Sequence, residues 1–128
     1  MPSLTLASGL TLAFADQGDS LGPTVLMLPG PTDSWRSYEL VLERLPRVVR
    51  AIAVSQRGHA ESDKPDVGYG IEDFAADVVG LLDALRIERT VLAAHSGKQS
   101  VWAAASASGD SISRSGVAAP NWQPTALP

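Results

Sequence analysis

Residues 90–97 read TVLAAHSG, a short apolar run that ends in a histidine, a serine and a glycine. A run that is apolar on both faces is typical of a central strand in a parallel sheet. Ser96 follows this strand directly. A tight turn into a helix would expose its hydroxyl as a nucleophile, and such a turn needs small neighbours. Ala94 is small but Lys98 is not, so the segment taken alone favours a plain turn at the end of a strand.

Strands and helices alternate upstream of this segment. Strands are predicted at 4–6, 11–16, 24–28, 48–54 and 90–94, and helices at 35–45 and 71–85. The first two strands would form a hairpin through Ser8 and Gly9, and the segment Pro29-Gly30-Pro31 stops the third. Alternating strands and helices imply parallel pairing with right-handed crossovers. The sequence therefore predicts an α/β fold with a mostly parallel sheet and flanking helices.

Composition and charge narrow the class of protein. The chain has 128 residues, of which 45% are hydrophobic, which suits one domain with a moderate core. The net charge is −4 with no basic cluster, so we expect neither nucleic acid nor a membrane as a partner. The absence of cysteine excludes disulfides and thiolate metal sites and suits a cytoplasmic location. We find no signal peptide, no phosphate loop and no metal-spaced cluster of His, Asp or Glu, so we predict neither cofactor nor metal.

A polar loop between the fourth strand and the second helix carries the most specific pattern. Residues 56–65 read QRGHAESDKP. Arg57, Gly58 and Ser62 fit the D-x-R-G-x-G-x-S loop that is common in the α/β-hydrolase family, with departures at Gln56 and Ala60. The opening hairpin and the segment after the third strand are also similar, with Pro-Gly where the family commonly has His-Gly. The chain thus resembles the N-terminal half of an α/β-hydrolase of the serine-nucleophile type over about residues 4–97.

The resemblance implies roles for four positions. Ser96 takes the nucleophile position, and the backbone N–H of Gly97 becomes one oxyanion-hole donor. A second donor should come from the segment after the third strand. Pro31 has no N–H there, so Gly30 or Thr32 would serve; the alternative is that this segment is only a rigid turn. A serine nucleophile implies an ester or related acyl substrate.

The partners that would activate this serine are missing from the sequence. The family order is Ser, then acid, then His, but no histidine follows His95. His95 adjoins the nucleophile and should point away from it. His59 belongs to the 56–65 loop, which we call the Arg-Gly-His loop after residues 57–59, and we expect it to pack within a turn there. Glu61 and Asp63 are expected to be solvated. The chain is thus predicted to be an incomplete catalyst; the alternative is a non-catalytic remnant or small-molecule-binding module of the same fold.

The character of the sequence changes at the end of this pattern. Residues 1–97 hold 21 of the 24 charged residues, and residues 98–128 are rich in Ala and Ser. We therefore divide the chain into the N-terminal half of a hydrolase domain, 1–97, and an atypical low-charge tail, 98–128. We expect no strand in this tail, which would be disordered or the product of a reading-frame slip or truncation. The alternative is a natural short variant. Without a following strand, the 90–94 strand would expose an edge, which predicts poor solubility or self-association through that edge.

Overall fold

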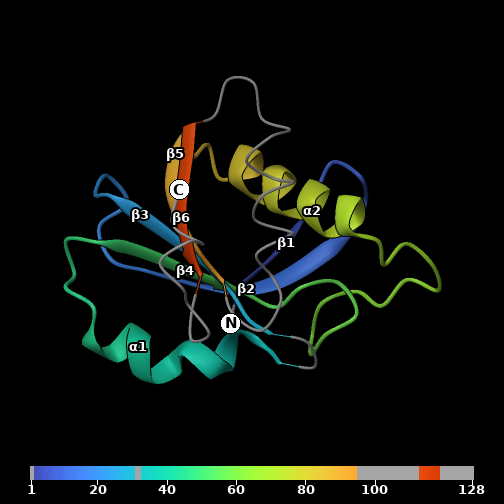
Figure 1. Ribbon diagram of the computed structural model, residues 1–128, viewed down its shortest axis with the longest axis horizontal. Helices are drawn as coiled ribbons and strands as arrows, with labels where there is room; N and C mark the ends of the chain where they lie inside the picture. The colour runs from blue at the N-terminus through green and yellow to red at the C-terminus, as the bar shows by residue number, and fades with distance from the viewer. Residues whose placement is uncertain (1, 31–32, 95–112, 119–128) are drawn as a thin grey trace.

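Six strands form a single mixed sheet in the computed structural model, which describes residues 2–30, 33–94 and 113–118. The strand order across the sheet is β1-β2-β4-β3-β5-β6 (Figure 1). The strands are β1 (Ser3–Thr5), β2 (Thr11–Gln17), β3 (Thr24–Leu28), β4 (Arg50–Val54), β5 (Arg89–Ala94) and β6 (Ser113–Ala118). The helices are the 3-10 helix η1 (Trp35–Tyr38), α1 (Glu39–Arg44) and α2 (Ile71–Ala84).

The sheet is antiparallel at one side and parallel through the rest. β2 pairs antiparallel with both β1 and β4, whereas β3 runs parallel to β4 and to β5. Parallel strands cannot be linked by a tight turn, so the connections between them are long. η1 and α1 lie between β3 and β4 in the chain, and α2 lies between β4 and β5, which flank β3 in the sheet. The prediction of a mostly parallel sheet with flanking helices is therefore confirmed.

The two faces of the sheet are covered by different helices (Figure 1). The larger core cluster lies on the α2 side and is built from side chains that alternate along the strands, such as Leu26, Ile52 and Leu92, which are 0% exposed. The smaller cluster packs Leu42 of α1 against Met27, Ala51 and Ala53. Burial of the strands on both faces explains why β3 and β4 are continuous apolar runs in the sequence.

The predicted helix over 35–45 divides into two kinds of turn. Its first four residues form η1, and the α-helix begins only at Glu39. Ser34 caps the start, because its side chain accepts a hydrogen bond from the backbone N–H of Arg36 at 3.2 Å. Short 3-10 turns are frequent at the beginnings of α-helices, so the hydrophobic period indicated a helix but not its type.

The expectation of no strand in the tail was wrong. β6 pairs in parallel with β5 over six residue pairs, from Arg89 opposite Ser113 to Ala94 opposite Ala118. A sheet is held by backbone N–H and C=O groups, which any sequence can supply, so a strand can form without an apolar run. β5 is consequently not an edge. Among the described residues, the outer edge on this side of the sheet belongs to β6.

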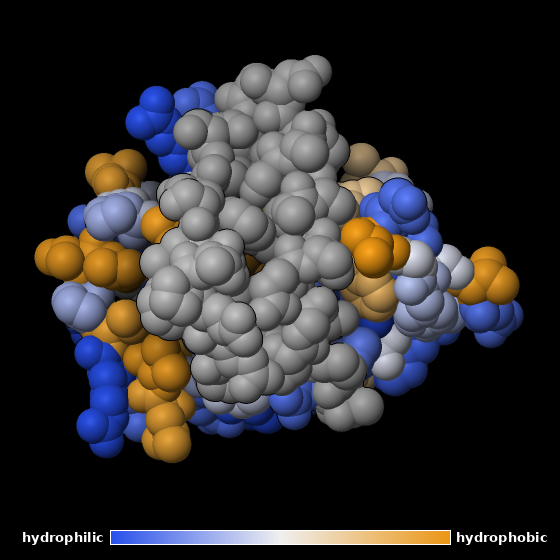
Figure 2. Space-filling model, in the orientation of Figure 1, coloured by the Kyte–Doolittle hydropathy of each residue, from blue (hydrophilic) through white to orange (hydrophobic). Residues whose placement is uncertain are grey.

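Part of the described surface is apolar. Figure 2 shows hydrophobic residues gathered on its left, over α1 and the loops that precede β3 and β4. The exposed hydrophobic side chains of these elements are Leu21, Leu40, Val41 and Val48. No helix in the described part of the chain is both long enough and apolar enough to cross a membrane.

Candidate active site

The carboxyl ends of β3, β4 and β5 meet at one edge of the sheet. Leu28 at the end of β3 pairs with Ala94 at the end of β5, and Met27 pairs with Ala53 of β4. Gly30 lies two residues beyond Leu28, as position 96 lies two residues beyond Ala94. The register therefore brings the segment that holds Gly30 and the segment that leads to the predicted nucleophile to the same edge. In open α/β sheets, this edge is where ligands bind.

Three of the four predicted site residues lie outside the described part of the chain. These are Ser96, Gly97 and Thr32; His95 lies outside it as well. Gly30 is described, and it is buried. Its carbonyl accepts a hydrogen bond from the N–H of Asp33 at 3.2 Å, which makes a turn directly after β3.

Two side chains hold the segment between β3 and η1 at its ends. At the β3 end, the hydroxyl of Tyr38 donates to the carbonyl of Leu28 at 2.8 Å. At the η1 end, the backbone N–H of Trp35 donates to the hydroxyl of Ser55 at 3.0 Å. The fully buried Pro29 adds rigidity within the segment, because its ring fixes φ. Gly30 is therefore carried by a segment with two fixed ends.

Burial and a nearby carboxylate keep Tyr38 in the form that can donate. Desolvation by burial raises the pKa of the Tyr38 hydroxyl, and the negative charge of Asp33 raises it further. Both causes penalise the phenolate, so the hydroxyl stays protonated through the physiological range. The hydrogen bond to Leu28 is thus insensitive to pH in that range.

Ser55 is fixed in turn by the rest of the sheet. It directly follows β4 and is 0% exposed. Its N–H donates to the carbonyl of Ala13 at 2.9 Å, and its carbonyl accepts a hydrogen bond from the hydroxyl of Ser62. The same Ser62 hydroxyl accepts the N–H of Ala13 at 2.8 Å. These bonds join β2, β4 and the 55–68 loop into one buried polar cluster.

The Arg-Gly-His loop has a structural role in the described part of the molecule. Arg57 binds Asp77 of α2 through two parallel hydrogen bonds of 2.7 Å, and a third of 2.7 Å joins it to the carbonyl of Gly68. The Asp77 carboxylate raises the pKa of the Arg57 guanidinium. His59 bonds through Nδ1 to the carbonyl of Arg57 at 2.8 Å. This ring nitrogen is therefore committed to a turn, as the sequence predicted.

The two acidic residues of this loop differ in what they contact. Asp63 is exposed, yet its carboxylate accepts the backbone N–H of Thr11 at 2.8 Å and so ties the loop to β2. Glu61 is exposed. The expectation that Asp63 is solvated is therefore only part of its role. Its carboxylate is exposed, but it also holds the hairpin through the bond to Thr11.

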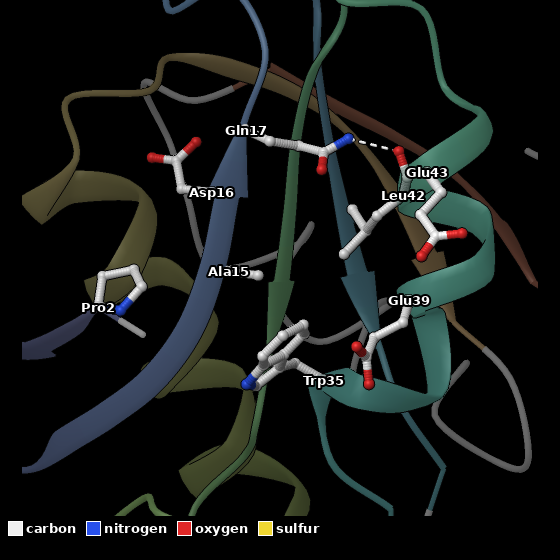
Figure 3. Close-up of a pocket in the computed structure, with 8 residues that line it drawn as sticks. All are labelled: Pro2, Ala15, Asp16, Gln17, Trp35, Glu39, Leu42 and Glu43. Carbon is white, nitrogen blue, oxygen red and sulfur yellow. Dashed lines mark hydrogen bonds between the residues drawn. The ribbon is translucent and has the colours of Figure 1, made fainter.

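A separate cavity of about 280 Å³ opens between β2 and the η1–α1 segment (Figure 3). Trp35, Glu39 and Glu43 line it from the helical side, while Ala15 lies on the β2 side. The Gln17 amide crosses the hollow and donates to the carbonyl of Leu42 at 2.6 Å. Its remaining lining residues are Pro2 and Asp16. None of these residues comes from the ends of β3 or β5, so this cavity is distinct from the predicted catalytic edge.

The described residues contain no cluster of side chains that could bind a metal ion. No group of three or more His, Cys, Asp or Glu side chains there could hold a metal ion.

Comparison with known proteins identifies the family. A model described as the alpha/beta hydrolase fold matches residues 23–114. The chain belongs to the α/β-hydrolase fold family. The match extends beyond residue 97 and includes residues 98–114 of the predicted tail.

Two curated relatives are similar over most of the chain. The chain is 40% identical over 89 residues to a 2-heptyl-3-hydroxy-4(1H)-quinolone dioxygenase of Mycobacteroides abscessus, which covers 69% of this chain and 33% of the relative. It is 39% identical over 98 residues to a 2-(acetamidomethylene)succinate hydrolase of Mesorhizobium japonicum, which covers 75% of this chain and 34% of the relative. The chain thus spans about a third of the length of these relatives.

Solved structures of the family agree with the fold. The crystal structure of E-2-(acetamidomethylene)succinate hydrolase superposes with a TM-score of 0.83 at 33% identity, covering 91% of this chain and 42% of that one. The structure of AqDC, described in terms of recognition and ring cleavage of the Pseudomonas quinolone signal, gives a TM-score of 0.74 at 32% identity, covering 83% and 40%. The α/β-hydrolase fold expected from the sequence is thereby confirmed.

Sequence reasoning missed two residues that shape this edge of the α/β-hydrolase fold. Tyr38 lies within the predicted helix 35–45, and Ser55 directly follows the predicted strand 48–54, but neither residue was assigned a role from the sequence. A polar residue directly after a buried strand was the available signal for Ser55, because a buried hydroxyl needs a partner. The contact of Tyr38 with Leu28 had no comparable signal, since it depends on how η1 packs on the sheet.

Proposed function

We propose that this chain carries the nucleophile of a serine-type hydrolase that acts on an ester or related acyl substrate. Ser96 is the nucleophile, Gly97 supplies one oxyanion-hole N–H, and Gly30 or Thr32 supplies the second. The observation that carries the proposal is the pairing of Leu28 with Ala94, which supports a common edge for Gly30 and Ser96. Membership of the α/β-hydrolase family adds support, because the family uses a nucleophile directly after this strand.

The chemistry requires groups of this kind at one edge. Attack of a serine hydroxyl on an acyl carbonyl forms a tetrahedral intermediate with a negatively charged oxygen. Backbone N–H groups that already point at this oxygen stabilise it without rearrangement. The buried Gly30 segment, held at both ends by Tyr38 and Ser55, suits such a fixed donor.

The general base is the missing component. No histidine follows His95 in the 128 residues, and His59 is bonded through Nδ1 within its own turn. The catalytic acid and base would therefore come from polypeptide outside these 128 residues. A serine hydroxyl without an imidazole is a weak nucleophile, so we propose that the isolated chain is catalytically incomplete.

A fluorophosphonate probe tests the nucleophile. We expect slow covalent labelling at Ser96, absent in Ser96→Ala and unchanged in the control Ser8→Ala, whose side chain lies in the exposed hairpin turn. Labelling at another residue, or none in folded protein, would count against Ser96. Rapid hydrolysis of aryl acetates by the isolated chain would leave Ser96 as the nucleophile but refute catalytic incompleteness.

The choice of acyl transfer over oxygen chemistry rests on Ser96. The two relatives are named as a dioxygenase and a hydrolase, and they are 40% and 39% identical to this chain, so identity does not separate these chemistries. Two assays do. Oxygen consumption with 2-heptyl-3-hydroxy-4(1H)-quinolone would favour the first relative's activity. Hydrolysis of simple esters that is lost in Ser96→Ala would favour acyl transfer through Ser96, although it would refute the catalytic incompleteness of the isolated chain.

A small-molecule-binding module without turnover is the second candidate. The cavity beside α1 favours it, because this hollow combines the Trp35 indole with the carboxylates of Glu39 and Glu43. An NMR screen of small organic amines, acids and neutral compounds would test it. Specific shifts of the Trp35 indole signal, in protein that fluorophosphonate does not label, would support this module over the hydrolase.

Self-association is a further proposal on partners. Because β6 lies at the edge of the described sheet, two copies could pair through it. Successive residues of a strand point their N–H groups to opposite sides, so one of Ser115→Pro and Gly116→Pro should remove an outward N–H. We expect sedimentation to show a dimer that one variant weakens while its circular dichroism stays native. A wild-type monomer at all concentrations would refute the pairing.

Charge and composition support the remaining proposals on environment. The net charge of −4 favours a small-molecule substrate over nucleic acid or an anionic membrane. The absence of cysteine supports a cytoplasmic location, which fractionation of cells that express the protein would test.

The low charge of residues 98–128 supports a reading-frame slip in the gene, although the family match up to residue 114 argues for a position later than Lys98. The downstream nucleotide sequence, translated in all three frames, tests this origin. A resumed strand, acid and histidine in another frame would support the slip.

A further inference from the structure

The side chain of Ser55 is a fixed, buried polar group next to the predicted catalytic edge. Ser55 is 0% exposed and directly follows β4. Its backbone N–H is bonded to Ala13 of β2, and its backbone carbonyl is bonded to the Ser62 hydroxyl. Because both of these backbone groups are hydrogen-bonded, the backbone that carries the Ser55 side chain is fixed. Its oxygen accepts the Trp35 N–H at 3.0 Å.

Trp35 is the first residue of η1 and therefore the end of the segment that leaves β3. The segment starts at Leu28, whose carbonyl is held by the Tyr38 hydroxyl, so both of its ends are attached to side chains. Between the ends, the N–H of Asp33 closes a turn on the carbonyl of Gly30. The hydrogen bond between Ser55 and Trp35 therefore ties the end of this segment to β4.

We propose that Ser55 is a positioning residue that sets the orientation of the Gly30 segment through its hydrogen bond to Trp35. Ser55 contacts no substrate in this proposal. It acts by holding the backbone from which the second oxyanion-hole donor is drawn. The positioning itself stands on the described contacts, whereas its catalytic consequence rests on the proposed function.

The neighbouring hydroxyls show why Ser55 is the critical one. Ser37 also lies in η1, but its hydroxyl donates to the Ser34 carbonyl at 3.1 Å in an exposed position, entirely within the helical turn. Removing it would leave the link between β4 and the segment intact. Ser37→Ala is therefore a matched control for Ser55→Ala, since both variants remove one serine hydroxyl that bonds to this part of the backbone.

The first measurement does not depend on activity. Amide hydrogen exchange and ¹⁵N-¹H NMR spectra are recorded for the full chain and for Ser55→Ala, Ser55→Thr and Ser37→Ala. We expect Ser55→Ala to raise the exchange rate of the Trp35 amide at least about tenfold, since its acceptor is lost. We also expect it to shift the Gly30 amide resonance while the amides of β3 stay unchanged. Ser55→Thr, which keeps the hydroxyl, should restore both, and Ser37→Ala should change neither.

The second measurement links the segment to chemistry through the fluorophosphonate labelling rate at Ser96. Misplacement of a catalytic group by about 1 Å can cost about a hundredfold in rate, so we expect a loss of about 10- to 100-fold in Ser55→Ala. Ser55→Thr should again recover most of the rate. If Ser55 had only a structural role, Ser55→Ala would lower the melting temperature. It would not also shift the Gly30 amide resonance and slow the labelling at Ser96, with both effects restored in Ser55→Thr.

The outcomes separate the two levels of the proposal. Native exchange and an unshifted Gly30 amide in Ser55→Ala would overturn the positioning role, whatever the labelling shows. A displaced Gly30 segment with unchanged labelling would overturn its catalytic consequence.

If the wild-type chain is not labelled at all, the proposed function fails, while the exchange and chemical-shift data still decide whether Ser55 positions the segment. If Ser55→Ala does not fold, the comparison of Ser55→Thr with wild type decides: altered Gly30 and Trp35 signals, despite the retained hydroxyl, would overturn the proposal.

Discussion

The ion pair between Arg57 and Asp77 should be a major source of stability for the Arg-Gly-His loop. The two side chains are only 12% and 6% exposed and are joined by two hydrogen bonds of 2.7 Å. Asp77→Ala would leave the Arg57 guanidinium buried without its counter-charge. Breaking a buried pair in this way costs about 3–5 kcal/mol, so we expect a loss of this size in the free energy of unfolding. Asp77→Asn keeps the shape and one acceptor and should lose about half as much.

A second pair in the same molecule provides the matched control. Arg50 binds Asp16 through hydrogen bonds of 3.1 and 2.8 Å, but the side chains are 14% and 25% exposed. Because water reaches this pair more easily, Asp16→Ala should cost only about 1–2 kcal/mol. The double variant Arg57→Met/Asp77→Leu removes both charges and should recover most of the loss caused by Asp77→Ala.

Urea denaturation followed by far-UV circular dichroism gives these differences. A domain of this size is stabilised by only about 5–15 kcal/mol in total, so the milder Asp77→Asn keeps the measurement within range if Asp77→Ala unfolds. The reasoning would be refuted if Asp77→Ala lost no more stability than Asp16→Ala. It would also be refuted if the double variant were less stable than Asp77→Ala alone, since that would mean that the buried charge carries no penalty.

Two further predictions concern the hairpin and the segment after β3. Gly9 and Gly18 both have positive φ, but a Cβ at Gly9 meets nothing within 4 Å, whereas one at Gly18 would lie 1.9 Å from the Val49 carbonyl oxygen. Thermal melting should therefore show a loss of about 1–2 kcal/mol for Gly9→Ala and of about 3 kcal/mol or more for Gly18→Ala, and equal losses would contradict the structure. Tyr38→Phe removes the donor to the buried Leu28 carbonyl and should cost about 1–2 kcal/mol near pH 7. Since the pKa of Tyr38 is raised in the fold, its contribution is complete below about pH 10 and is lost at higher pH. The wild type should thus lose its advantage over Tyr38→Phe in urea titrations above pH 10, and a constant difference would refute this.

Local patterns in the sequence were sufficient to predict most of the strands and helices. β3 and β5 were found as short apolar runs, and α2 as a helical repeat from Ile71 to Leu85 that ends within one residue of its observed end. The hairpin was found from Ser8 and Gly9 at its turn. These patterns succeed because burial on one or both faces leaves a periodic trace in the sequence.

β6 shows where such reasoning stops. Its residues, SRSGVA, carry no apolar period, and its pairing with β5 is a property of two backbones that are distant in sequence. A strand of this kind is defined by its neighbour rather than by its own side chains. No inspection of the local sequence would have found it.

The candidate site divides in the same way. The sequence by itself determined the chemical identity of the groups, a serine after an apolar strand and a glycine after another, because reactivity belongs to residue type. Only the tertiary structure decided that Leu28 and Ala94 are neighbours, and that Ser55 and Tyr38 hold the Gly30 segment between them. Strand register and hydrogen bonds across 20 residues are fixed by the packing of the whole sheet, so no short stretch of sequence contains them.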